Sequence, residues 1–100
     1  MAVSKTTPQS RGPLEREFVI TNQYGIHARP AALFVKTASR FDADVQVEKD
    51  GNRVSGKSIM GLMTLEASRG CKLRVIVAGV EAQQAMDELG ALVESGFDEE

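Results

Sequence analysis

The spacing of its apolar residues constrains the fold of this chain most. Some segments have apolar residues at every second position, as in a β-strand, and others have them at helical spacing, so their order predicts the order of strands and helices. Segments 16–22, 44–48 and 71–79 carry apolar side chains at alternate positions, which predicts β-strands with one buried face. A fourth strand follows the Asp50-Gly51 pair, which is a strong signal for a hairpin turn. The sequence therefore predicts four strands, of which the second and third form a hairpin.

Three further segments repeat apolar residues at the spacing of an α-helix. Segment 28–41 has Pro30 in its first turn, where the missing N–H costs nothing, and segment 58–68 has Ser58 as a candidate N-cap. A last helix ends before Gly96. The core-facing residues of the first and last helices are expected to be Ala31, Phe34, Val35, Ala38 and Phe41, and Ala82, Ala85, Met86, Leu89, Leu92 and Val93.

Seven elements in the order βαββαβα fit one domain, because 100 residues can bury one small core. Helices cannot cover both faces of so small an antiparallel sheet, so we expect an α+β fold with three helices on one face. Residues 1–14 are polar and hold two of the three prolines, which predicts a flexible tail. The domain would span 15–97, and the acidic end at 98–100 is expected to fray.

Composition excludes several classes of function. The net charge is −2 and basic residues are scattered among acidic ones, which argues against a nucleic-acid binder. The single cysteine, Cys71, allows no internal disulfide, and there is no Cys/His cluster or glycine-rich nucleotide loop, so neither metal nor cofactor is expected. The chain lacks a signal-peptide pattern and an apolar run of about 20 residues, which predicts a cytoplasmic protein that does not insert into membranes.

The stretch YGIHARPAAL, residues 24–33, holds His27, the only histidine of the chain. At the first turn of a helix, unpaired backbone N–H groups and the positive end of the macrodipole favour anions such as phosphate. A neutral imidazole is a nucleophile, and Arg29 adds a planar donor fork that matches phosphate oxygens. The stretch therefore indicates a site that accepts a phosphoryl group. A surface histidine without chemistry remains the alternative on these residues alone.

Ser58 has two interpretations. It can be a helix N-cap, which contributes about 1 kcal/mol to stability. It can also be a phosphorylation site, because a helix N-terminus tolerates a phosphate.

The short second helix carries more apolar residues than one buried face needs. Ile59, Met60 and Met63 point away from the face that holds Leu62, and on the first helix Leu33 also lies off the core-facing stripe. Methionine is common at adaptable binding surfaces, and exposed apolar patches usually mark a protein partner. We therefore expect a docking patch near the histidine; a helix buried on two sides is the alternative.

Two motifs together resemble a known family. GIHARPAA (25–32) and GKSIMGLMTL (56–65) are similar to the motifs of HPr, the histidine-containing phosphocarrier of the bacterial phosphoenolpyruvate-dependent phosphotransferase system. The resemblance extends over about residues 16–95. The family fold, an open-faced β-sandwich with three helices on one face of a four-stranded antiparallel sheet, agrees with the element order.

The resemblance implies a monomeric phosphoryl carrier rather than an enzyme. His27 would be phosphorylated at Nδ1 by enzyme I, which takes the group from phosphoenolpyruvate, and would pass it to enzyme IIA domains of sugar permeases. Arg29 would stabilise the phosphohistidine. Ser58 would be the serine that HPr kinase/phosphorylase modifies in many bacteria, with a transcriptional regulator as a further partner. The docking surface would comprise Ala28, Ala32, Leu33, Lys36, Ile59, Met60 and Met63.

The sequence departs from the family pattern in two places. A polar extension precedes the first strand, and Glu66 stands where many members have glycine. The stretch EASRG (66–70) looks like the nitrogen-related branch of the family. A second hypothesis is therefore a regulatory binding module of that branch, or of catabolite control, that acts by docking rather than in sugar uptake. A small α/β domain with an incidental histidine is the third.

Overall fold

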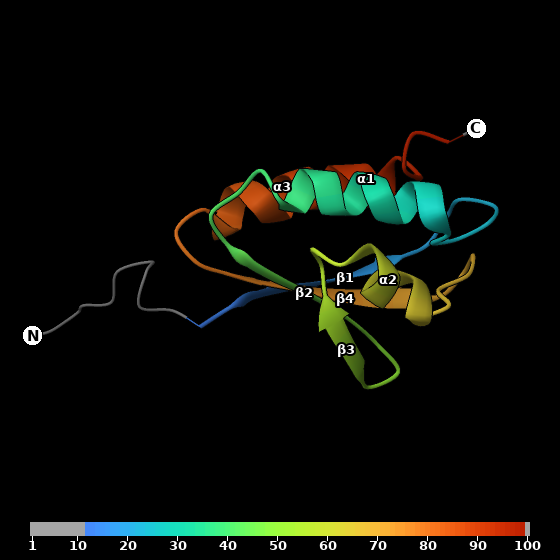
Figure 1. Ribbon diagram of the computed structural model, residues 1–100, viewed down its shortest axis with the longest axis horizontal. Helices are drawn as coiled ribbons and strands as arrows, with labels where there is room; N and C mark the ends of the chain where they lie inside the picture. Colours follow the sequence, from blue (N-terminus) through green and yellow to red (C-terminus); the bar gives the residue numbers. More distant parts are fainter. Residues whose placement is uncertain (1–11, 100) are drawn as a thin grey trace, which may run out of the picture.

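The computed structural model describes residues 12–99 and contains the seven elements in the predicted order (Figure 1). Most of the expected N-terminal tail, and Glu100, lie outside the described residues. The elements are β1 (Leu14–Val19), α1 (Ala28–Ala38), β2 (Asp44–Lys49), β3 (Asn52–Ser55), α2 (Ile59–Thr64), β4 (Lys72–Ala78) and α3 (Ala82–Glu94).

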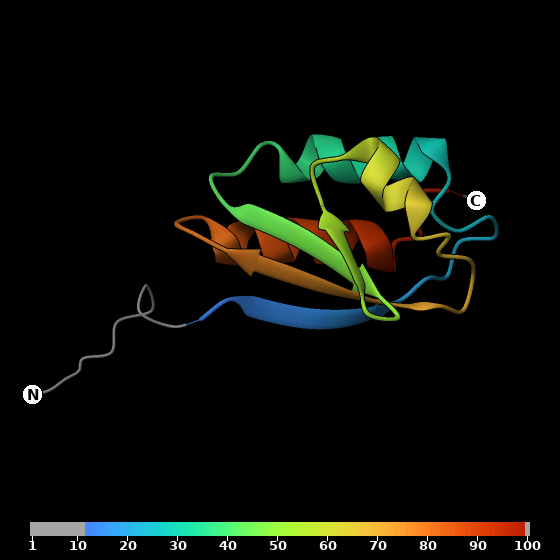
Figure 2. The ribbon, with the colours of Figure 1, turned by 60° about the horizontal axis from the view of Figure 1, so that its bottom comes forward.

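The four strands form one antiparallel sheet in the order β1-β4-β2-β3. All three helices lie on the same side of this sheet, with α1 and α3 next to each other and α2 beside the first half of α1 (Figures 1 and 2). The hairpin between β2 and β3 turns through Asp50 (φ 53°) and Gly51 (φ 83°), as a two-residue turn requires. The α+β sandwich expected from the sequence is confirmed.

The core lies between the sheet and the helices. Phe18 and Ile20 are buried while Val19, between them, is half exposed, as the predicted alternation requires. Ile76 departs from that alternation, because it is buried although it faces away from the helices; its register partners there are Glu15 and Gln46. The largest fully buried side chains are Phe34, Phe97, Ile20, Leu62, Leu73, Met86, Leu89, Val45, Val47, Val75, Val77 and Val93.

Two helices end earlier than predicted. The first helix stops at Ala38, although Phe41 still packs against the core from the following turn. The second stops at Thr64, because the backbone of Glu66 takes a positive φ of 52° that no α-helix can continue. Apolar spacing predicted both helices too long because residues beyond a helix end can still face the core.

Both ends of the described domain make contacts within it. Leu14, placed in the tail by its polar neighbours, begins β1 and pairs with Val77. After α3, Gly96 (φ 69°) turns the chain back and Phe97 is buried. Glu99 then accepts a hydrogen bond from the side chain of Asn22. The fraying expected for 98–100 stays a prediction.

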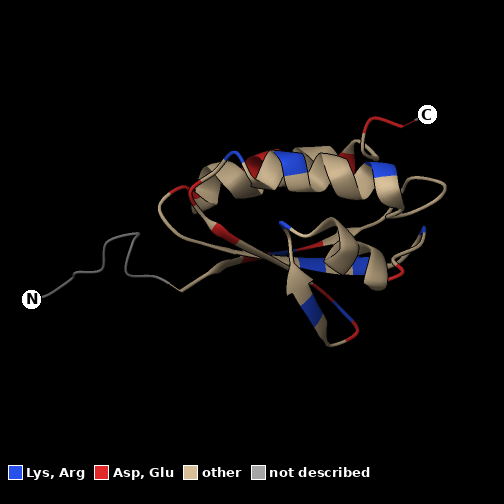
Figure 3. Ribbon diagram, in the orientation of Figure 1, with Lys and Arg blue, Asp and Glu red and all other residues tan. Residues whose placement is uncertain are grey.

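Charges are interspersed over the ribbon without a continuous basic stripe in this view (Figure 3). The two charged residues of α1, Arg29 and Lys36, are both basic. None of the helices within residues 12–99 is long and apolar enough to cross a membrane.

Candidate functional site

His27 occupies the N-cap of α1, with extended backbone angles (φ −97°, ψ −167°). Its carbonyl accepts the first intrahelical bond, from the amide of Ala31 at 3.0 Å, and its side chain makes no capping hydrogen bond. Pro30 has no N–H. Within the described residues, the backbone amides of Ala28 and Arg29 have no hydrogen-bond partner and are the open donors of the first turn, next to the imidazole.

The loop before His27 packs tightly on the segment that follows α2. The amide of Ile26 donates to the carbonyl of Ala67 at 2.8 Å. Gly25 has a φ of 64°, and a Cβ placed on it would lie 2.2 Å from the Ala67 carbonyl oxygen, so only glycine fits there. This contact holds the start of α1 beside the end of α2.

The imidazole of His27 is partly exposed, at 42% of its side-chain surface, yet its Nε2 atom is buried. Nε2 lies 3.2 Å from Oε2 of Glu99, within ion-pair distance. The ring N–H does not point straight at that oxygen, so Nε2 has no well-aligned hydrogen bond within residues 12–99. Tyr24, itself largely exposed, meets the ring edge-on with centroids 6.3 Å apart. The accessible part of the imidazole is therefore the part away from Nε2.

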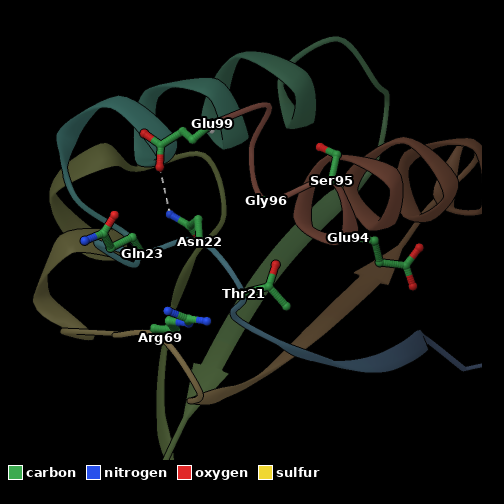
Figure 4. A pocket seen from close by; sticks show the side chains of 8 residues that line it. All are labelled: Thr21, Asn22, Gln23, Arg69, Glu94, Ser95, Gly96 and Glu99. Carbon is green, nitrogen blue, oxygen red and sulfur yellow. Dashed lines mark hydrogen bonds between the residues drawn. The ribbon is translucent and has the colours of Figure 1, made fainter.

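Asn22 is the one buried polar residue among those described. Its Nδ2 donates to the carbonyl of Gly25 at 2.8 Å. It also donates to Oε1 of Glu99 at 3.0 Å (Figure 4). Sequence reasoning missed both residues. The NQYG turn was a signal for Asn22, because Asn side chains often bond nearby backbone in turns. No local signal marks Glu99, which lies far from His27 in sequence.

A polar hollow of about 340 Å³ opens beside this group (Figure 4). Asn22 and Glu99 form part of its wall, so the hollow adjoins His27 through them. The lining residues are Thr21, Asn22, Gln23, Arg69, Glu94, Ser95, Gly96 and Glu99.

Arg29 is exposed and takes part in none of the ion pairs formed within residues 12–99. Its guanidinium can therefore meet an incoming anion without breaking an internal pair. Its position in the first turn places a positive charge on the end of α1 where the backbone amides are open.

Ser58 is the N-cap of α2, as one interpretation of the sequence predicted. Its Oγ accepts a hydrogen bond from the amide of Gly61 at 2.9 Å, and its backbone is extended. The side chain is half-buried, so part of it remains open to solvent. Its use as a phosphorylation site stays a prediction.

The predicted apolar surplus of α2 is exposed. Met60 is 72% exposed, Ile59 40% and Met63 38%, whereas Leu62 is buried. Leu33 on α1 is half-buried and packs against the core, so its misfit with the core-facing stripe is only partial. Because α1 and α2 contact each other, we define the α1–α2 patch as Ala28, Ala32, Leu33, Lys36, Ile59, Met60 and Met63.

Among residues 12–99, a half-exposed imidazole, two amides without partners and a guanidinium outside any ion pair lie at one helix start, an arrangement suited to a protein that carries a phosphoryl group on histidine. The sequence of residues 14–95 matches the family described as the PTS HPr component phosphorylation site. The chain belongs to the HPr family of phosphocarrier proteins, which are carriers rather than catalysts.

Relatives of different lengths share this domain. The HPr-like protein Crh of Bacillus subtilis is 51% identical over 70 residues, which cover 70% of this chain and 82% of Crh. The multiphosphoryl transfer protein of Haemophilus influenzae is 39% identical over 101 residues, which cover 98% of this chain. This chain spans only 20% of that protein.

Solved structures agree with the fold. HPr of Thermoanaerobacter tengcongensis has a TM-score of 0.84 and 46% identity, covering 87% of this chain and 98% of its own. The HPr dimer of the same organism gives a TM-score of 0.70 at 46% identity, covering 82% of this chain and 94% of its own.

Proposed function

We propose that His27 accepts a phosphoryl group from phospho-enzyme I and passes it to enzyme IIA domains of sugar permeases. The observation that carries the proposal is the place of the only histidine, half exposed at the N-cap of α1. The open amides of Ala28 and Arg29 face the same solvent region, so a transferred phosphate would meet donors already in place.

The transfer needs positioning and charge neutralisation more than covalent help from the protein. A ring nitrogen of neutral His27 attacks phosphorus in line as the bond to the donor breaks. The backbone amides and the Arg29 guanidinium take up the charge on the phosphate oxygens. The reverse sequence unloads the group onto the acceptor, so the protein is loaded and unloaded and is not itself an enzyme.

The α1–α2 patch would dock both partners. It combines exposed apolar side chains with Lys36 and lies on the two helices beside His27. Apolar groups of this kind on a small surface usually mark a protein interface. A partner seated there would bring its own phosphorylated or accepting side chain to the start of α1.

The experiment that tests this function is incubation with enzyme I and labelled phosphoenolpyruvate. Wild type should form an acid-labile adduct, His27→Ala should form none, and Arg29→Ala should load more slowly. Arg53→Ala is the matched control, because Arg53 is an exposed arginine in β3 that pairs with Glu48. A wild-type protein that takes up no label would contradict the proposal. Equal loading of the Arg29 and Arg53 variants would show that Arg29 does not contribute to phosphoryl transfer.

A second candidate function is regulation through Ser58, whose Oγ stands at the N-cap of α2 within reach of solvent. Phosphorylation there by HPr kinase/phosphorylase would add charge beside the α1–α2 patch and alter docking to enzyme I or a transcriptional regulator. Deleting the gene separates this regulatory function, in catabolite control or the nitrogen-related branch, from sugar transport. Unchanged sugar uptake with altered gene expression supports regulation, and reduced uptake supports transport.

The monomeric state also remains a prediction, as does a cytoplasmic location. Light scattering at two protein concentrations measures the mass directly. A mass near 10.8 kDa at both supports the monomer, and a doubled mass would replace it with a dimer.

A further inference from the structure

We propose that Glu99 is a positioning residue that sets which nitrogen of His27 carries the proton. The proposal rests on the proposed function, because it concerns the nitrogen that would attack phosphorus. It starts from a chain of contacts that runs from the Gly25 carbonyl through Asn22 to Glu99 and ends on Nε2 of the imidazole.

The first link of this chain has only one orientation. A backbone carbonyl can only accept, so the amide group of Asn22 must turn its NH₂ toward the oxygen of Gly25, 2.8 Å away. The second N–H of the same NH₂ then points to Oε1 of Glu99 at 3.0 Å. Because Asn22 is buried, no water layer lies around it to permit the flipped amide.

The second link presents an acceptor to the ring. Glu99 uses one oxygen for Asn22 and turns the other toward Nε2 of His27, 3.2 Å away. An ionised carboxylate only accepts, and a neutral imidazole has one N–H and one lone pair. A lone pair on Nε2 would face the carboxylate oxygen and be repelled, whereas an N–H is attracted even at imperfect alignment. The proton is therefore held on Nε2, and the lone pair is on Nδ1.

The position of Glu99 is itself supported by the core. Gly96 reverses the chain after α3, Phe97 is buried, and the amide of Phe97 donates to the carbonyl of Leu92 at 2.9 Å. The amide of Glu99 donates to the carbonyl of Gly96 at 3.1 Å. A buried anchor two residues before Glu99 keeps its carboxylate near the ring.

This arrangement prepares the ring for the transfer. The Nδ1 lone pair forms the new N–P bond as the bond between phosphorus and the donor breaks, and that electron pair leaves with the donor. The proton stays on Nε2 while the ring becomes positively charged. The Glu99 carboxylate already faces that side of the ring, so it stabilises the charge without rearranging.

The decisive variant is Glu99→Gln, which keeps the shape and changes one acceptor into a donor. Asn22 still offers an N–H, so the oxygen of the new amide must face Asn22 and its NH₂ must face His27. That NH₂ needs a lone pair on Nε2, which moves the ring proton to Nδ1. We expect ¹⁵N NMR of the histidine ring at alkaline pH to show Nε2–H in wild type and Nδ1–H as the major tautomer in Glu99→Gln. Phosphoryl acceptance should fall by about tenfold or more.

Two further variants serve as controls. Glu94→Gln removes the same charge from the end of α3, but Glu94 pairs with Arg16 at 3.1 Å rather than with His27, so the tautomer should not change. Glu99→Ala removes acceptor and donor alike and should leave a mixture of both tautomers. An unchanged ring spectrum in Glu99→Gln, or a change of equal size in Glu94→Gln, would overturn the proposal.

The spectrum is read on the free protein, so the result does not depend on whether phosphoryl transfer occurs. If wild type is never phosphorylated but the ring proton of His27 still moves to Nδ1 in Glu99→Gln, only the proposed function is contradicted. A wild type that loads normally while the tautomer ignores Glu99 contradicts the positioning role alone.

Discussion

The hydroxyl oxygen of Ser58 lies 2.9 Å from the backbone nitrogen of Gly61 and caps α2. This cap satisfies one of the amides at the start of the helix, which have no partner within the helix. It matters for α2, which has only six residues. Ser58→Ala should lower the free energy of unfolding by about 1 kcal/mol. Ser58→Asp should keep most of that stability, since aspartate also caps. Urea unfolding measures both, and equal stability of wild type and Ser58→Ala would show that the cap contributes nothing.

Glu66→Gly should stabilise the protein. Glu66 has a φ of 52°, a left-handed conformation that costs an L-residue about 1–2 kcal/mol, and glycine adopts it freely at some cost in chain entropy. We expect a net gain of about 0.5–1 kcal/mol in the free energy of unfolding. The control is Glu88→Gly, within α3, which should lose about 1 kcal/mol. If both changes destabilise, the strain assigned to Glu66 is absent.

Gly25→Ala should destabilise the domain more than Gly70→Ala does. Both glycines have positive φ, 64° and 91°, so both alanines are strained. A Cβ at Gly25 would also strike the carbonyl of Ala67, whereas at Gly70 nothing lies within 4 Å. We expect a loss of more than about 2 kcal/mol at Gly25 and about 1 kcal/mol at Gly70, measured by thermal unfolding. Equal losses would mean that the loop moves aside without cost.

Met60→Glu should slow phosphoryl acceptance and leave the fold intact. Met60 is 72% exposed in the α1–α2 patch, so its replacement should change stability by less than about 0.5 kcal/mol. The charge would have to be buried against an apolar partner, which raises the enzyme I concentration needed for half-maximal loading. Val80→Glu is the control, because Val80 is 81% exposed in the loop between β4 and α3, at the end of the molecule away from the start of α1 (Figure 1). The same loss in both variants would contradict the docking surface.

Cys71 should react with alkylating agents at a lower pH than an ordinary thiol. The Ser68 hydroxyl, 3.4 Å from Sγ, lowers the pKa of Cys71 by hydrogen bonding, with smaller help from the backbone of Ser68 and the charge of Lys49. A lowered pKa means that the reactive thiolate already forms at lower pH. Ser68→Ala should shift the pH midpoint of iodoacetamide labelling upward. If the pH midpoint of labelling is unchanged in Ser68→Ala, the Ser68 hydroxyl does not lower the pKa of Cys71.

Much of the fold could be predicted from local pattern. Alternation identified three of the four strands, because one buried face forces every second side chain to be apolar. The Asp50-Gly51 pair marked the hairpin and with it the remaining strand. The ends of the helices were predicted less accurately. Phe41 is apolar for its contact with the core rather than for a place in α1, and periodicity cannot separate the two.

The sequence by itself determined the order of elements, the helix start at His27 and the excess of apolar side chains on α2, because each depends on neighbours within one or two turns. Only the tertiary structure placed Glu99 on the imidazole and Asn22 on the other oxygen of Glu99. That contact depends on how α3 packs and on the burial of Phe97, which turn the end of the chain back over the site. Interactions between residues so distant in sequence leave no periodic trace, so no local pattern could reveal them.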